Sequence, residues 1–182
     1  MSLRIRNLYR EDIPTIAAAF HALGWDKPAL QYEAYFEEQE RGERPVLVAF
    51  WEEEFVGYLT VMWQSHYLSF REAGIPEIVD FNVLPPFRGK GIGNSLMERA
   101  EEIVAERTAC IGIGVGMTAD YGAAQRIYVR RGYLPDGRGL TYDNRFLKHG
   151  ERVCVDDSLV LHFTKDLKLS ATISPKGAEA EI

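Results

Sequence analysis

The chain has 182 residues, of which 46% are hydrophobic and 26% are charged, and its formal net charge is −6. This length and composition indicate one globular domain with enough chain to bury a substantial core. The acidic balance argues against broad nucleic-acid binding, and no segment approaches the ~20 apolar residues of a membrane span or shows a signal-peptide pattern, so we expect a cytoplasmic protein that binds neither nucleic acid nor membrane.

The N-terminal half of the chain predicts strands and helices from the spacing of its apolar residues. An alternating segment comes first, and residues 11–14 then open a helix with acidic groups and a proline in its first turn. A second helix is expected to turn Leu30, Ala34 and Tyr35 inward, and its Tyr32 and Phe36 fit either the core or a ligand. The expected elements are a strand at residues 3–8, helices from residue 11 and at 27–41, a hairpin of strands at 46–51 and 55–63, and a loop or short helix at 66–75.

The C-terminal half begins with a predicted strand, residues 78–84, that leads into a helix at residues 92–106. In the strand that follows, residues 110–117, apolar side chains share one face and three glycines share the other. Glycines along one face indicate close approach by either a helix or a ligand. Further strands are expected at 139–145 and 152–163, and residues 166–182 are expected to form a mobile tail.

A glycine-rich loop before the helix at residues 92–106 is the most informative feature of the sequence. Residues 83–93 read Val-Leu-Pro-Pro-Phe-Arg-Gly-Lys-Gly-Ile-Gly. A strand that leads through prolines and glycines into a helix brings backbone N–H groups together, and with Arg88 and Lys90 these suit an anionic phosphate group. The spacing fits neither a P-loop, because Gly91 follows Lys90, nor the Gly-x-Gly-x-x-Gly dinucleotide motif. The alternative is a helix entry in which glycine allows tight packing.

A second motif, residues 124–133, reads Ala-Gln-Arg-Ile-Tyr-Val-Arg-Arg-Gly-Tyr. Ala124, Ile127 and Tyr128 share one face of a predicted helix, which the arginines and the glycine would end. On its own, Tyr128 also fits an ordinary core tyrosine. Together, Arg-x-x-Gly-x-Gly at residues 88–93 and this helix end, in this order, resemble the two signatures of the GNAT superfamily of N-acetyltransferases.

The resemblance implies the GNAT fold and acetyl-CoA as the acetyl donor. Residues 1–165 would form an α/β (α+β) domain with a mixed, mostly antiparallel central sheet of about six to seven strands, flanked by about four helices, whose central strands splay to admit the pantetheine arm. Backbone groups at Val83 would hold the acetyl–pantetheine end. We expect Gly91 and Gly93 to need positive φ or close phosphate approach. The residues implied to bind the pyrophosphate are Arg88, Gly89, Lys90, Gly91, Ile92, Gly93 and Asn94.

The resemblance also nominates catalytic residues. Tyr128 would be the general acid that protonates the leaving thiolate, since a phenol with a pKa near ~10 is protonated at neutral pH. Asp80, Glu77 and His66 are candidates for the general base, acting through water, and Asp80 equally fits a counter-ion for the amine. Many members carry asparagine where this chain has Tyr121, so a contact to the pantetheine is lost or moved to neighbouring groups.

We therefore expect an acetyl-CoA-dependent N-acetyltransferase that acts on a primary amine by direct attack in a ternary complex. The acceptor is a small molecule, a peptide amino-terminus or a lysine, and a homodimer is one expected form. The alternative is a catalytically silent acyl-CoA-binding or sensing module. Cys110 and Cys154 are expected to be reduced and buried, and the four histidines lack metal-ligand spacing, so no metal site is expected.

Overall fold

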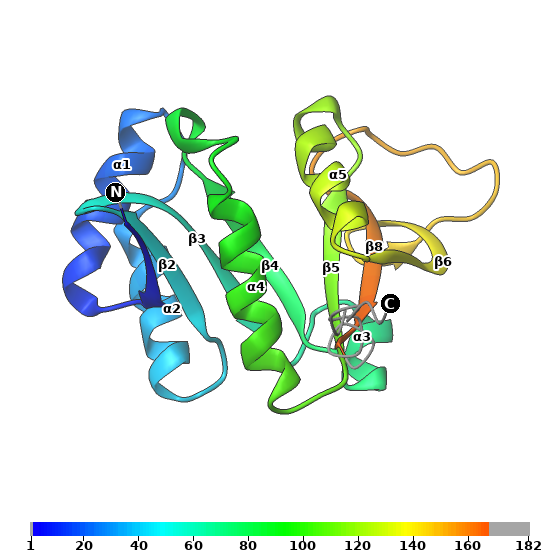
Figure 1. Ribbon diagram of the computed structural model, residues 1–182. Helices are drawn as coiled ribbons and strands as arrows, with labels where there is room; N and C mark the ends of the chain where they lie inside the picture. Colours follow the sequence, from blue (N-terminus) through cyan, green and yellow to red (C-terminus); the bar gives the residue numbers. More distant parts are fainter. Residues whose placement is uncertain (1, 168–182) are drawn as a thin grey trace, which may run out of the picture.

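The computed structural model describes residues 2–167, which form one open sheet with helices on both faces (Figure 1). Its strands are β1 Leu3–Asn7, β2 Val46–Trp51, β3 Glu54–Met62, β4 Glu77–Val83, β5 Cys110–Gly116, β6 Leu134–Tyr142, β7 Arg145–Phe146 and β8 Leu159–Asp166. They lie in the order β1-β2-β3-β4-β5-β8-β6-β7. All neighbours are antiparallel except β4 and β5, which confirms the expected mixed sheet, with 8 strands in place of six or seven.

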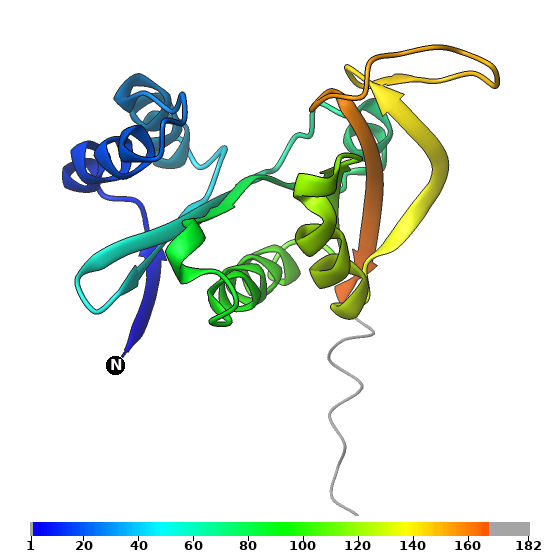
Figure 2. The same cartoon turned by 90° about the horizontal axis from the view of Figure 1, so that it is seen from above.

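Helices cover both faces of this sheet. The α-helices among residues 2–167 are α1 Ile13–Ala22, α2 Ala29–Glu40, α3 Leu68–Ala73, α4 Ile92–Ala105 and α5 Gly122–Arg130, and the 3₁₀ turns are η1 Arg10–Asp12, η2 Pro85–Phe87 and η3 Ala119–Tyr121. Figure 2 shows α1 and α2 on one side of the sheet and α4 and α5 on the other. No helix in this part of the chain is long and apolar enough to cross a bilayer.

Two apolar cores lie on opposite faces of the sheet, because successive strand residues point to opposite sides. The first core packs strand residues such as Leu59 and Ile113 against Leu96 of α4. The second packs Phe20 of α1 against Tyr58 of β3. Strands β2 and β3 are therefore buried almost throughout their length. At the end of β4 the two layers approach each other, since Arg88 Cζ, before α4, lies 6.0 Å from the ring centroid of Trp25 in the α1–α2 connection.

The two central strands separate shortly after they begin. β4 and β5 pair only at Glu77 with Gly112 and at Ile78 with Ile113. Beyond these pairs the strands diverge, and Figure 1 shows β4 with α4 on one side of the opening and β5 with α5 on the other. The expected splay of the central strands is thus confirmed. The last strand of the sheet ends at Asp166, one residue past the domain boundary expected at residue 165. From residue 168 onward, the predicted mobile tail lies outside the described residues.

Some expectations for individual segments are wrong. In α2, Leu30 is 73% exposed and Ala34 is exposed as well, whereas Tyr35 packs against the core as expected and Tyr32 is fully buried in it. Helix α2 packs on the sheet through aromatic and polar side chains, so its apolar spacing was a poor guide. The strand expected at residues 152–163 begins only at Leu159, and Cys154, which precedes it, is exposed and not buried.

Side chains of the protein itself fill the glycine face of β5. A Cβ added to Gly112 would lie 2.3 Å from Cε2 of Phe70 in α3, and one added to Gly116 would lie 2.5 Å from Cε2 of Tyr121. At these two positions the close neighbour is therefore an aromatic ring on an adjacent helix or turn. Of the two explanations for the glycine pattern, packing applies here.

Replacing Gly112 with alanine is expected to lower the melting temperature, because the methyl group would overlap the Phe70 ring. Overpacking of this kind typically destabilises by about 1–3 kcal/mol. The matched control is Gly122→Ala in α5, where an added Cβ meets nothing within 4 Å and alanine favours the helix. Thermal unfolding of both variants tests this, and a Gly112→Ala protein as stable as Gly122→Ala would contradict the packing explanation.

Candidate active site

The loop between β4 and α4 has backbone conformations that require glycine. Gly89 and Gly91 have φ values of 75° and 86°, in the left-handed region that residues with a Cβ seldom adopt. Gly91 is also the N-cap of α4. Gly93 does not have a positive φ, and an added Cβ there would lie 3.1 Å from Cζ of Phe81. Gly91 therefore needs glycine for its backbone, as expected, whereas Gly93 needs it for packing.

This loop leaves a row of backbone donors without partners. Within the described part of the chain, no backbone N–H from residue 89 to residue 94 donates a hydrogen bond. Free amides at a helix start attract anions, because the helix dipole adds to their partial positive charge. The Arg88 side chain closes the loop by donating from Nε to the Val83 carbonyl oxygen at 3.0 Å, and Lys90 is exposed beside it. The residues present therefore fit a phosphate group.

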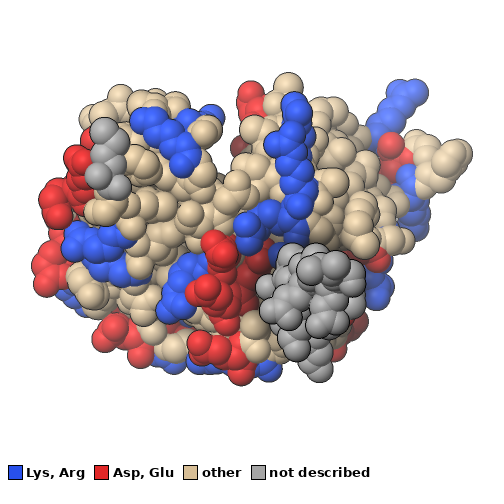
Figure 3. All heavy atoms as spheres, in the orientation of Figure 1, with Lys and Arg blue, Asp and Glu red and all other residues tan. Residues whose placement is uncertain are grey.

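The surface is hollowed where the central strands separate. Figure 3 shows a notch between the half of the molecule that carries α4 and the half that carries α5, with Lys and Arg side chains on both sides. Arg88 and Lys90 are exposed before α4, and Arg126 and Arg130 are exposed on α5. Although the whole chain carries a net charge of −6, Lys and Arg side chains lie on both sides of the notch in Figure 3. The local field therefore favours an anionic ligand.

Tyr128 lies in α5, on the far side of the opening from the glycine loop. Its side chain is only 5% exposed and packs in the core shared with α4, where its ring centroid is 6.1 Å from that of Tyr133. The hydroxyl group has no hydrogen-bond partner among the described residues. Burial is the main cause that raises the pKa of Tyr128 above its usual value. The phenol is therefore a protonated donor that is free to bond a ligand atom.

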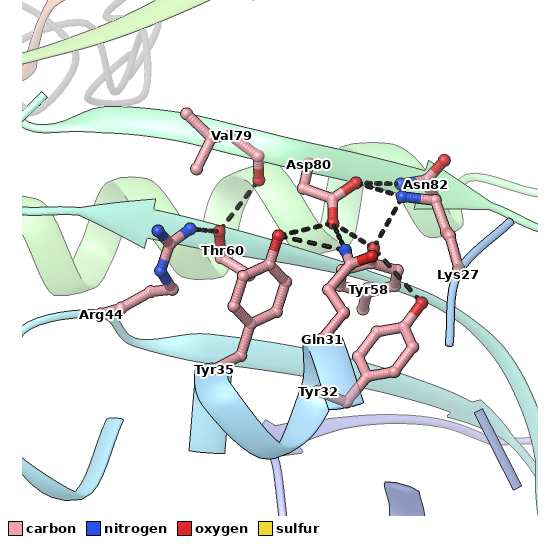
Figure 4. Close-up of polar contacts among 10 residues, drawn as sticks. All are labelled: Lys27, Gln31, Tyr32, Tyr35, Arg44, Tyr58, Thr60, Val79, Asp80 and Asn82. Atoms are coloured by element: carbon pink, nitrogen blue, oxygen red, sulfur yellow. Dashed lines mark hydrogen bonds and ion pairs between the residues drawn. The ribbon is translucent and has the colours of Figure 1, made fainter. Parts of the chain in front are cut away.

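Asp80 sits at a bulge of β4 and collects donors from several elements (Figure 4). Its Oδ1 accepts from Lys27 Nζ at 2.6 Å and Asn82 Nδ2 at 2.9 Å. Its Oδ2 accepts from the side chains of Gln31 at 2.7 Å, Tyr35 at 3.0 Å and Tyr58. The carboxylate thus accepts hydrogen bonds from one cationic and four neutral side chains. We name Asp80 and its four neutral donors, Gln31, Tyr35, Tyr58 and Asn82, the Asp80 cage.

The cage holds a strained backbone. Asp80 has a φ of 51°, a left-handed value that costs a residue with a Cβ roughly 1–2 kcal/mol. Burial, and next the Asp80 charge, raise the pKa of Tyr35 to about 12 and raise that of Tyr58 well beyond its usual value. Both phenols therefore remain protonated and keep donating to the carboxylate. Strain that is over-determined by surrounding contacts is typical of functional positions.

The other two candidate bases have different surroundings. Glu77 is buried, accepts a hydrogen bond from Ser65 Oγ at 2.5 Å, and has Oε1 4.0 Å from His162 Nε2. Burial raises the pKa of Glu77, and the hydrogen bond from Ser65 partly opposes this rise. Burial lowers the pKa of His162 to about 4. His162 is therefore neutral at pH 7 and gives Glu77 no counter-charge. His66 is exposed at the surface.

Tyr121 occupies the position where asparagine was expected to contact the pantetheine. Its ring covers Gly116 at the end of β5, and its hydroxyl group donates to Asp157 Oδ1 at 3.0 Å. Gln125 Nε2 donates to the Gly116 carbonyl oxygen at 2.9 Å. The end of β5 is thus closed by side chains from η3 and α5, and Tyr121 is tied to the segment that precedes β8.

Several residues of this site were not found from the sequence. Lys27, Gln31 and Tyr58 surround Asp80, and His162 lies beside Glu77, yet none belongs to a motif. The only available signal was the presence of Tyr58 and His162 in otherwise apolar strands, which suggests buried polar groups that need partners. Their partners lie far away in the sequence.

Comparison with known proteins agrees with this geometry. The sequence profile of the acetyltransferase (GNAT) family matches residues 4–133. No curated protein is significantly similar to the chain in sequence. Among solved structures, an N-acetyltransferase from Staphylococcus aureus Mu50 superposes with a TM-score of 0.66 and 21% identity over 92% of this chain and 99% of that one.

Two further structures are similar to the same extent. YncA from Salmonella typhimurium, whose structure contains its cofactor acetyl-CoA, has a TM-score of 0.66 and 18% identity over 100% of this chain and 99% of its own. Ribosomal-protein-alanine N-acetyltransferase from Brucella melitensis has a TM-score of 0.65 and 22% identity over 90% and 99% of the two chains. At these identities the likeness establishes the fold alone.

Proposed function

The chain belongs to the GNAT acetyltransferase family, and on that premise we propose that it transfers the acetyl group of acetyl-CoA to a primary amine in a ternary complex. The observation that carries this proposal is the row of unbonded amides at residues 89–94, placed at the mouth of a splayed sheet. These amides, with Arg88 and Lys90, would hold the pyrophosphate. Backbone groups at Val83 would hold the acetyl–pantetheine end between the diverging strands.

The reaction needs a proton donor and a proton acceptor on opposite sides of the bond that changes. Acetyl-CoA, when bound, supplies a thioester whose C–S bond breaks as the amine nitrogen forms the new C–N bond. Tyr128 holds the proton for the departing sulfur, since its hydroxyl group is unbonded and its raised pKa keeps it protonated at neutral pH.

Asp80 and Glu77 have separate tasks in this proposal. Asp80 acts as the counter-ion of the amine, because its carboxylate oxygens already accept from a resident ammonium group and from four neutral donors that hold them in place. Glu77 takes the proton of the amine through water. Its raised pKa brings its proton affinity closer to that of a general base that works near neutral pH.

The pH profile of kcat/KM tests the role of Glu77. A base acts only when deprotonated, so kcat/KM of the wild type is expected to fall as the pH drops through the raised pKa of Glu77. Glu77→Gln is expected to lower the plateau by about 10²–10⁴-fold and to remove this acid limb. His66→Gln, at the exposed third candidate, is the control and is expected to keep the wild-type profile. An acid limb that persists in Glu77→Gln would assign the base elsewhere.

Two measurements test the function as a whole. Calorimetry with acetyl-CoA is expected to show one binding site per chain, and consumption of acetyl-CoA is expected with at least one class in a panel of alkylamines, peptides and lysine. Binding without turnover of any amine would favour the silent acyl-CoA-binding module. Absence of acetyl-CoA binding at millimolar concentration would contradict both.

A further inference from the structure

The ammonium group of Lys27 lies in a site that complements an alkylammonium ion. Its Nζ is 2.6 Å from Asp80 Oδ1 and donates to the Tyr58 hydroxyl oxygen at 3.1 Å. The same nitrogen is 5.7 Å from the ring centroids of both Phe20 and Tyr58. A carboxylate, a phenol oxygen and two aromatic rings are the groups that stabilise a partly desolvated ammonium ion. The geometry around Lys27 is therefore that of a cation site.

The carboxylate of Asp80 has hydrogen-bond donors other than Lys27. A buried carboxylate costs free energy unless donors satisfy its oxygens. If Lys27 left, the side chains of Gln31, Tyr35, Tyr58 and Asn82 would still donate to the two carboxylate oxygens. The cage is thus organised to keep an anion in place while its cationic partner changes.

Lys27 itself reaches the cage from a segment without regular structure. Residues 25–28 connect α1 to α2 outside any helix or strand, and the Lys27 side chain is 19% exposed. Figure 4 shows the Lys27 side chain entering the cage at one end, next to Asn82, while the tyrosines come from α2 and β3. A flexible four-carbon stem on an irregular segment can withdraw without disturbing the two cores.

We propose that the Asp80 cage is the docking site for the ammonium group of the acetyl acceptor, and that Lys27 is a resident ammonium that the acceptor displaces. This inference rests on the proposed acetyl transfer and names its substrate class as primary alkylamines that arrive as cations. Asp80 and Val83 belong to the same strand, β4, so an amine held here lies on the strand that would hold the acetyl end. The aromatic rings of Phe20 and Tyr58 would flank its methylene groups.

The first test is a thermal one that does not depend on turnover. Lys27→Ala leaves room for an alkylammonium ion, whereas Lys27→Met fills the space of the stem without its charge. We expect n-butylamine to raise the melting temperature of Lys27→Ala, and to leave Lys27→Met and the wild type unchanged at the same concentration. n-Butanol, a neutral molecule of similar length, is expected to have no effect. Equal effects of butanol and butylamine would overturn the proposal.

The second test links the cage to the acceptor. Because a tethered competitor acts at millimolar effective concentration, the KM for n-butylamine as acceptor is expected to be about tenfold or more lower in Lys27→Ala than in the wild type, with Lys27→Met between them. The KM for acetyl-CoA is expected to stay unchanged. If all three proteins acetylate butylamine with the same KM, the contact between Lys27 and Asp80 is a structural ion pair. The inference about the acceptor site would then be wrong, while the proposed acetyl transfer would stand. If acetyl-CoA binds but none of the three proteins acetylates any amine, both the proposed acetyl transfer and the inference about the acceptor site are wrong.

Discussion

Replacing Tyr128 with phenylalanine is expected to lower kcat by about 10²–10⁴-fold while the affinity for acetyl-CoA stays unchanged. The hydroxyl group has no partner within the described residues, so its removal leaves no buried group unsatisfied. Its proposed action comes only as the C–S bond breaks, and an interaction confined to the transition state affects kcat rather than binding. Because burial raises its pKa, the phenol holds its proton throughout the neutral range, and the effect is expected to be independent of pH there.

Tyr133→Phe is the matched control for this experiment. Tyr133 is fully buried beside Tyr128, and its hydroxyl group donates to Glu101 Oε1 at 3.1 Å. Glu101 keeps its bonds from Arg131 and Lys165 in the variant. Loss of one hydrogen bond to a charged carboxylate is expected to cost about 1.5–3 kcal/mol of stability with kcat unchanged. A Tyr128→Phe protein that behaves in the same way, less stable but fully active, would remove Tyr128 from the mechanism.

The fold was largely accessible from the sequence because its signals are local. Nearly continuous apolar runs at residues 46–51 and 55–63 indicate strands buried on both faces, and the apolar spacing of α4 indicates its buried face, so the bounds of β2, β3 and α4 lie close to those expected. Helix α2 has no such signal, since it packs through Tyr32 and leaves Leu30 in solvent. The long approach to β8 was misread as strand, because strand propensity does not show where a partner strand is in reach.

In the candidate site, too, only the residues with a local sequence signal could be predicted. Gly89 and Gly91 could be recognised because their positive φ values favour glycine, so the glycines appear in the sequence as part of a motif. The Asp80 cage could not, because it depends on tertiary proximity: Lys27 and Gln31 reach Asp80 from the α1–α2 connection and from α2, and Tyr58 reaches it from β3. Any of these residues, taken alone in the sequence, has an ordinary surface or core explanation.

Gly91→Val is expected to weaken acetyl-CoA binding by at least about 100-fold without unfolding the protein. Gly91 combines a φ of 86° with a position at the N-cap of α4, in the middle of the unbonded amides. An added Cβ meets no protein atom within 4 Å, so the side chain would extend into the space from which a phosphate group approaches. Losing two hydrogen bonds to a charged ligand, at about 1.5–3 kcal/mol each, is sufficient for that reduction.

Gly150→Val separates this steric effect from backbone strain. Gly150 has a φ of 81°, an added Cβ there also meets nothing within 4 Å, and the residue lies between β7 and β8, outside the glycine loop. Both variants force a β-branched residue into the left-handed region, so both are expected to lose a similar amount of stability, about 1–2 kcal/mol. Only Gly91→Val is expected to lose acetyl-CoA binding by calorimetry. Wild-type affinity in Gly91→Val would mean that the phosphates bind elsewhere, and an equal loss in both variants would trace the defect to strain transmitted through the fold.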